Sequence, residues 1–140
     1  MIRAFDDADL HDIVEAWYRA SLVAHSFLTS EFFETEREQI ATQWMPSAET
    51  YVYEVDDHIV GFVALVGNDV GAIFVHPDHQ RHGIGHALMD HATTLRPSLE
   101  LEVFEENMIG RSFYAAYGFE FVSARPEETT GHTVHRLRLS

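Results

Sequence analysis

Cysteine and lysine are both absent from this chain of 140 residues. The absence of cysteine excludes disulfide bonds, a thiolate nucleophile and a cysteine-ligated zinc site. No hydrophobic run approaches the roughly 18 residues that a membrane-spanning helix needs. The amino-terminal stretch is acidic and amphipathic, which is not typical of a secretory signal. We therefore expect one cytoplasmic domain that does not contact membranes.

Positive charge is scarce as well. The chain has 23 acidic residues against nine basic ones, all of them arginine, and a formal charge of −14. A surface of this charge repels nucleic-acid phosphates, so we expect no nucleic-acid partner. It favours cationic partners such as amines through electrostatic steering. A second interpretation is that the acidic residues only maintain solubility, as in salt-adapted proteins.

The hydrophobic pattern predicts alternating strands and helices. We expect strands over residues 2–5, 50–55, 59–66, 70–75, 99–104, 119–124 and 133–139. We expect helices from Asp6 or Asp7 to about His25 and over residues 31–44, 84–95 and 108–117. Met45-Pro46 should end the second helix. The order βααβββαβαββ predicts an α/β domain with three layers, in which helices cover a mixed sheet.

A loop with two glycines, Gly83 and Gly85, joins the strand at 70–75 to the helix at 84–95. Amide groups at a helix start lack partners, and glycine lets a ligand approach them closely. The helix dipole adds positive potential, so this segment can hold a pyrophosphate. Arg81 adds a cation. The motif is neither a Walker phosphate loop nor the dinucleotide fingerprint, and on spacing alone an ordinary glycine-rich turn is the alternative.

Two motifs resemble the GNAT superfamily of N-acetyltransferases. The segment Gln80-Arg81-His82-Gly83-Ile84-Gly85 resembles its Q/R-x-x-G-x-G/A signature. The run from Asn107 to Phe119 resembles its N-x-x-A-x-x-F-Y-x-x-x-G-F block, with Gly110 at the usual alanine. Residues 24–32 are similar to the small bacterial branch that contains YjaB and YiaC. In addition, Gly71 stands where some relatives carry an acidic residue.

The resemblance covers nearly the whole chain and implies a single N-acetyltransferase domain over residues 1–140 with the acyl-CoA N-acyltransferase fold. It implies transfer of an acetyl group from acetyl-CoA to a primary amine, with no metal. Two groups of residues would bind acetyl-CoA. Those at the phosphates are Gln80, Arg81, His82, Gly83, Ile84, Gly85 and His86. Those along the pantetheine arm are Ile73, Phe74, Val75 and Asn107, with Tyr114 at the thioester sulfur.

The chemistry of acetyl transfer requires groups that move protons. Only the neutral amine attacks, so a base or a water chain must take a proton from the ammonium form. The candidates for this base are His25, Asp69, His76 and Glu102. His25 should lie where the first two helices flank the acceptor cleft. Tyr114 would stabilise the departing thiolate mainly by hydrogen bonding, because a phenol is a weaker acid than a thiol.

The residue types present also bear on the mechanism and on the class of protein. The lack of cysteine favours direct transfer in a ternary complex over an acyl-enzyme. His82 and His86 have a spacing that suits two metal ligands on one helix, but no third ligand is evident and we expect no metal. A non-catalytic, CoA-binding regulatory domain is the alternative to an enzyme. We expect a cationic acceptor and a monomer or homodimer; the sequence leaves protein lysine, a protein amino terminus and small-molecule amines open as acceptors.

Overall fold

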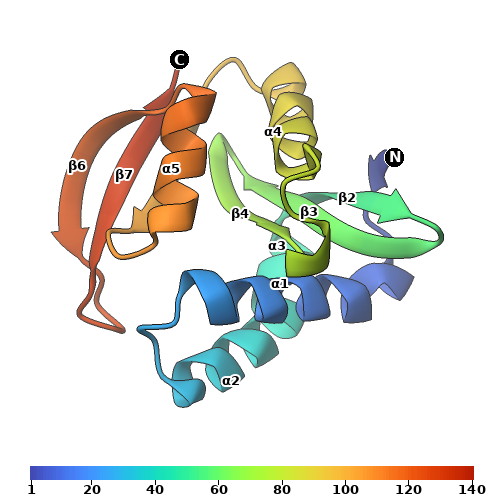
Figure 1. Cartoon of the computed structure of the whole chain (residues 1–140), viewed down its shortest axis with the longest axis horizontal. Helices are drawn as coiled ribbons and strands as arrows, with labels where there is room; N and C mark the ends of the chain where they lie inside the picture. The colour runs from blue at the N-terminus through green and yellow to red at the C-terminus, as the bar shows by residue number, and fades with distance from the viewer.

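The computed structural model describes all 140 residues and contains a seven-stranded sheet with helices on both faces (Figure 1). The strands are β1 (Ile2–Ala4), β2 (Glu49–Val55), β3 (His58–Val66), β4 (Asp69–Val75), β5 (Leu99–Phe104), β6 (Glu120–Pro126) and β7 (Thr133–Leu139). They lie in the order β1-β2-β3-β4-β5-β7-β6. β4 and β5 run parallel and all other neighbours run antiparallel, so the predicted mixed sheet is confirmed.

The helices form the outer two layers. They are α1 (Leu10–Ala24), α2 (Ser30–Gln39), α3 (Met45–Ser47), α4 (Ile84–Leu95) and α5 (Met108–Tyr117). α1 and α2 lie on one face of the sheet, and α4 and α5 lie on the other (Figure 1). The predicted order of elements is therefore confirmed, with the short α3 added. None of these helices combines the length and the apolar character that crossing a bilayer requires.

Each face of the sheet has its own hydrophobic core, as β3 illustrates. Successive side chains of a strand point to opposite faces. Phe62 and Ala64 pack with residues of α1 and α2, whereas Val63 and Leu65 pack with residues of α4. All four are almost fully buried, so β3 is an interior strand that both helical layers cover.

The predicted end of the second helix at Trp44 was wrong. After α2 the chain forms a π-helical turn, Ile40–Trp44, in which the Met45 amide donates to the Ile40 carbonyl. The helix then continues as α3, with Pro46 in its first turn. Proline is tolerated at the first positions of a helical segment, so Pro46 does not end the helix. The turn leaves Trp44 with about half of its surface exposed, 51%.

The sheet divides between β4 and β5. These strands pair at one position, Asp69 with Glu100, and then separate. At this closed end, Arg136 of β7 donates to Asp69 over 2.8 Å and to Glu100 over 2.7 Å. The arginine therefore ties three strands together where the gap begins. Beyond it, the inner edges of β4 and β5 are free to receive another molecule.

Candidate active site

A cavity of about 960 Å³ occupies the gap between β4 and β5. The ends of α1 and α2 bound it on one side, and the start of α4 and of α5 bound it on the other. Most of the predicted site residues line it: His25, Ile73, Phe74, Val75, Gln80, Arg81, Gly83, Ile84, Gly85, His86, Asn107 and Tyr114. Of the residues predicted to bind acetyl-CoA, only His82 does not. The fold thus brings both sequence motifs to one place.

The start of α4 presents unpaired amides to this cavity. Gly83 precedes the helix with a positive φ of 79°, and a Cβ atom built on it would meet nothing within 4 Å. The Ala87 amide donates to the Gly83 carbonyl. The amides of Ile84, Gly85 and His86 come before this bond and have no acceptor within the helix. Backbone donors and open space therefore coincide, as an anion site requires.

Two residues of the glycine-rich loop have structural contacts of their own. The Gln80 side-chain amide donates to the Val75 carbonyl over 2.9 Å, which fastens the loop to the end of β4. A Cβ atom on Gly85 would lie 3.3 Å from the Phe113 ring. The small size of Gly85 therefore lets α4 and α5 pack closely, whereas Gly83 opens the loop to a ligand.

The free edge of β4 offers amides to the gap. Beyond the strand, the His76 amide donates to the Val60 carbonyl of β3. Amide direction alternates along a strand, so the amides of Val75 and Ile73 point away from β3 and toward β5. β5 does not pair with them. An extended chain lying in the gap could therefore add to β4 as an extra strand.

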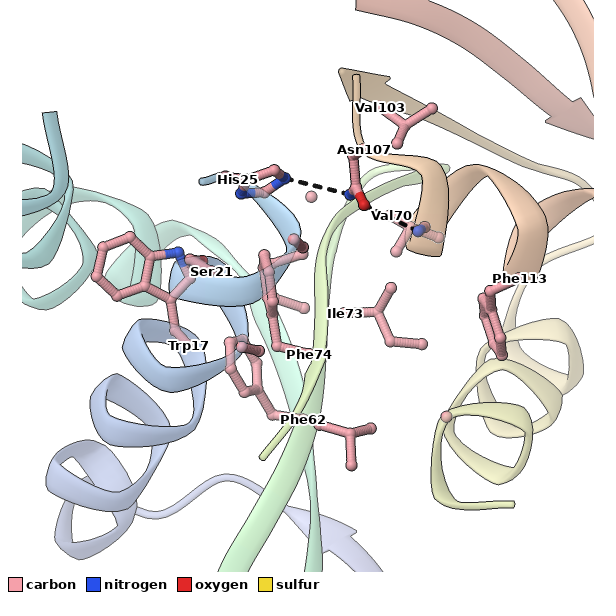
Figure 2. Close-up of a pocket in the computed structure, with 18 of the residues that line it drawn as sticks. Trp17, Ser21, His25, Phe62, Val70, Ile73, Phe74, Val103, Asn107 and Phe113 are labelled. Carbon is pink, nitrogen blue, oxygen red and sulfur yellow. Dashed lines mark hydrogen bonds between the residues drawn. The ribbon is translucent and has the colours of Figure 1, made fainter. Parts of the chain in front are cut away.

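His25 and Asn107 face each other across the cavity (Figure 2). The Asn107 side-chain oxygen accepts the Gly110 amide at 2.9 Å and caps α5. The Asn107 Nδ2 lies 3.2 Å from Nε2 of His25 at the end of α1. Because Nδ2 can only donate, Nε2 accepts and the imidazole proton lies on Nδ1. A Cβ atom on Gly110 would lie 2.6 Å from Nδ2, so only glycine leaves room for this arrangement.

His25 is neutral in this setting. Burial lowers the pKa of its imidazole to about 4. Its ring lies among three phenylalanine rings, with centroids 5.3 Å away for Phe104, 5.9 Å for Phe27 and 6.3 Å for Phe74. Both the burial and the bond from Asn107 hold the ring uncharged at physiological pH.

Tyr114 lines the cavity on the α5 side. Burial raises the pKa of its phenol above the ordinary value, so the phenol keeps its proton at neutral pH. Its ring is fixed by Phe113 and Phe119, whose centroids lie 5.5 and 5.7 Å away. The arrangement holds a protonated phenol in the cavity wall.

The other candidate bases are engaged elsewhere. Asp69 is bound to Arg136 as described, and Glu102 forms a bidentate pair with Arg125 at 2.8 and 3.2 Å. His76 does not line the cavity, and its Nδ1 accepts the Asp78 amide.

Two polar residues of the cavity wall were not singled out from the sequence. Glu36 of α2 and Ser21 of α1 both line the cavity. Glu36 shares the apolar stripe of α2 with Phe33 and Ile40, at helical spacings of three and four. A charged residue inside an apolar stripe is a signal that could have identified Glu36. Ser21 carries no such signal, because serine is common on either face of a helix.

The histidines near the loop are not arranged around a common point. His86 Nδ1 lies 3.2 Å from Asp90 on the next turn of α4. No group of three or more histidine, aspartate or glutamate side chains in the structure is placed to hold a metal ion. The side chains of this region instead make pairwise contacts.

Comparison with known proteins supports the geometry. A family model described as an acetyltransferase (GNAT) domain matches residues 46–121. Over 93% of the chain, 31% of residues are identical to the peptidyl-lysine N-acetyltransferase YiaC of Escherichia coli, covering 90% of that protein. Over 82%, 36% are identical to the peptidyl-lysine N-acetyltransferase YjaB of Salmonella typhimurium, covering 79% of it.

A solved structure is similar across almost the whole chain. The solution structure of apo YjaB from Escherichia coli aligns with a TM-score of 0.86 at 28% identity. The alignment covers 99% of this chain and 95% of that one. The matched family region contains the gap between β4 and β5, the glycine-rich loop and α5. The chain therefore belongs to the GNAT acetyltransferases, the family that its two motifs predicted.

Proposed function

We propose that this protein is an acetyl-CoA-dependent N-acetyltransferase whose acceptor is the side-chain amine of a lysine in a peptide or protein. Three features meet in one cavity, and their combination carries the proposal. They are an anion cradle formed by the free amides of Ile84, Gly85 and His86, the free edge of β4, and the protonated phenol of Tyr114. A phosphate-bearing extended chain with a thioester at its end matches these three features in order. Both relatives are named peptidyl-lysine N-acetyltransferases, which supports lysine as the acceptor.

We propose that the cradle binds the pyrophosphate of acetyl-CoA. The amides of Ile84, Gly85 and His86 would donate to its oxygens, and the helix dipole and Arg81 would supply the positive potential that the acidic chain otherwise lacks. The pantetheine arm would pair with the amides of Ile73 and Val75. In this position the thioester carbonyl lies beside a backbone donor that can polarise it.

We propose that the acetyl group moves directly to the acceptor. The neutral amine nitrogen forms a bond to the thioester carbon and the carbon–sulfur bond breaks. The proton that the nitrogen loses passes through water to the leaving thiolate, which also accepts a hydrogen bond from the Tyr114 hydroxyl. The chain has no cysteine to carry an acyl intermediate. Much of the acceleration would come from holding amine and thioester together, because proximity alone can supply a large part of a rate enhancement.

An assay of thiol release tests this proposal. Purified protein and acetyl-CoA are incubated with a lysine-containing peptide, a peptide whose only amine is its amino terminus, and a polyamine. We expect thiol release to be fastest with the lysine peptide and mass spectrometry to show one acetyl group on its side chain. Binding of CoA without thiol release for any acceptor would instead indicate a regulatory domain.

A further inference from the structure

The acceptor half of the cavity has aromatic walls. The residues that form them come from α1, α2, the π-helical turn and the facing side of the sheet: Trp17, Phe32, Phe33, Trp44, Phe62 and Phe74. Figure 2 shows Phe74 directed toward the α1 side of β4, whereas Ile73 is directed toward the α5 side. Walls of this kind favour an apolar ligand chain, whose burial removes hydrocarbon from water.

Three carboxylates line the cavity, and they differ in their partners. Asp69 and Glu102 are each neutralised by an arginine, at 2.8 Å in both cases. Glu36 has neither an ion-pair nor a side-chain hydrogen-bond partner, although it is partly buried. Its neighbour Arg37 is directed elsewhere, with its guanidinium 4.2 Å from the centre of the Tyr18 ring.

The surroundings of Glu36 oppose its negative charge. Burial raises the pKa of this carboxyl, and the charge of Glu127 in the loop between β6 and β7 raises it further. A buried charge without a partner is costly, and a nearby like charge adds to the cost. A cation held by Glu36, within the field of Glu127, would relieve both effects. The apolar cavity therefore offers one unmatched anionic group.

Ser21 is a second group with an unmet hydrogen bond. It is fully buried, and its hydroxyl has no partner in the structure. A serine inside a helix commonly donates to the carbonyl four residues earlier, but Ser21 does not. Ser21 lines the same cavity as Glu36, but its hydroxyl oxygen has almost no accessible surface there. The assignment of the acceptor site therefore rests on Glu36.

We propose that Glu36 binds the ammonium group of the acceptor, and that the aromatic walls select a primary amine on a slender, unbranched aliphatic chain. This inference rests on the proposed acetyl-transfer function and specifies its acceptor. The ammonium ion matches the unpaired carboxylate in charge, and the methylene chain of a lysine matches the apolar walls.

Glu36→Gln tests the charge, and Glu34→Gln is its matched control. Glu34 is an exposed residue of α2 that does not line the cavity. At saturating acetyl-CoA, we expect Glu36→Gln to raise the KM for a lysine peptide about 10- to 100-fold, the range for a hydrogen bond to a charged group. Glu34→Gln should behave like the parent. Equal KM values for the two variants would overturn the assignment of Glu36.

A second acceptor separates charge recognition from damage to the site. A linear O-alkylhydroxylamine such as O-pentylhydroxylamine is slender and is uncharged at neutral pH. We expect Glu36→Gln to acetylate it at the parent rate, because no ammonium needs to be bound. A parallel loss with this amine and the lysine peptide would show that the variant disturbs the cavity, and the assignment would be wrong.

The shape of the acceptor is tested with two amines of equal carbon number. Hexylamine and cyclohexylamine are both cations at neutral pH, but only the first is slender. We expect kcat/KM to favour hexylamine by at least roughly tenfold, since a misfitting group forfeits buried apolar contact. Equal kcat/KM values for the two amines would show that the aromatic walls do not select the shape of the acceptor.

Calorimetry tests Glu36 without turnover. The lysine peptide is titrated into the parent and into Glu36→Gln, each saturated with CoA. We expect weaker binding to the variant by the same factor as the change in KM. If the parent released no thiol with any acceptor, the proposed acetyltransferase function would be wrong. The titration would still test Glu36, because weaker binding to the variant supports it as the ammonium site and equal binding refutes it.

Discussion

Asn107 donates a hydrogen bond to His25 over 3.2 Å and thereby joins the end of α1 to the start of α5 across the active-site cavity. The same amide group caps α5 through its oxygen. One side chain therefore sets the position of a helix start, the tautomer of a histidine and the width of the gap between the two helical layers. The residue that permits this arrangement is Gly110.

Gly110→Ala should destabilise the protein. Alanine normally stabilises a helix relative to glycine by about 1 kcal/mol. Here its Cβ atom would lie 2.6 Å from the Asn107 amide, so the cap and the bond to His25 must move. Loss of a cap costs about 1 kcal/mol or more. Thermal denaturation should show a lower Tm, and the imidazole nitrogen shifts of His25 should change in NMR spectra. A raised Tm with unchanged His25 nitrogen shifts would show that Asn107 can accommodate the added methyl group.

Gly83→Val should weaken binding of CoA by roughly tenfold or more, because its side chain would enter the space before the free amides of α4. The change also imposes backbone strain of about 1–2 kcal/mol at a positive φ. Gly67→Val controls for this strain, since Gly67 has a φ of 60°, equally open surroundings and a position in the turn between β3 and β4. Calorimetry compares the two. Equal affinities in folded variants would contradict the cradle.

Tyr114→Phe should lower kcat by roughly 10- to 1,000-fold and leave the affinity for acetyl-CoA nearly unchanged, because the ring stays while the donor is lost. Tyr117→Phe is the matched control. Its hydroxyl donates to Asp90 over 2.6 Å and does not line the cavity. Steady-state kinetics under conditions where chemistry limits the rate should separate the two variants. A normal kcat for Tyr114→Phe would remove this phenol from the mechanism.

His25 should make stability depend on pH. Its pKa is about 4 in the folded protein and about 6.5 in a model peptide, so the folded state favours the neutral ring. The resulting stabilisation is complete above pH 6.5 and is lost as the pH falls toward 4. It amounts to up to about 3 kcal/mol.

Urea unfolding of the parent and of His25→Gln tests this dependence. The difference in unfolding free energy should shrink between pH 7 and pH 4, because only the parent carries the histidine. His11→Gln, at an exposed position near the start of α1, provides the control. A difference that stays constant over this range would show that His25 is not held neutral by the fold.

The order of elements was predictable because local patterns decide it. The alternation in β2 and the glycine-rich start of α4 both act within a few residues, and the structure confirms them. The end of α2 was missed because the π-helical turn depends on packing of Ile40 and Phe33 against the sheet rather than on propensity. Pro46 signals the end of a helix only when its ring meets a regular helical turn.

The half of the cavity that we propose for acetyl-CoA was predictable, because both sequence motifs line it. Gln80 and Asn107 lie in the motifs, although each also bonds to protein groups that no spacing reveals. The acceptor half was less predictable. The engagement of Asp69 and Glu102 by arginines of distant strands depends on long-range pairing, and so does the isolation of Glu36.

The π-helical turn also gives the protein an optical reporter. Trp17 and Trp44 are its two tryptophans; the first is buried and the second is half exposed at the cavity wall. An indole that leaves water emits at shorter wavelength, so occupation of the acceptor half should shift the emission of Trp44 to the blue. In Trp17→Phe, fluorescence would then follow the arrival of an acceptor in real time, without a label and before any acetyl group is transferred.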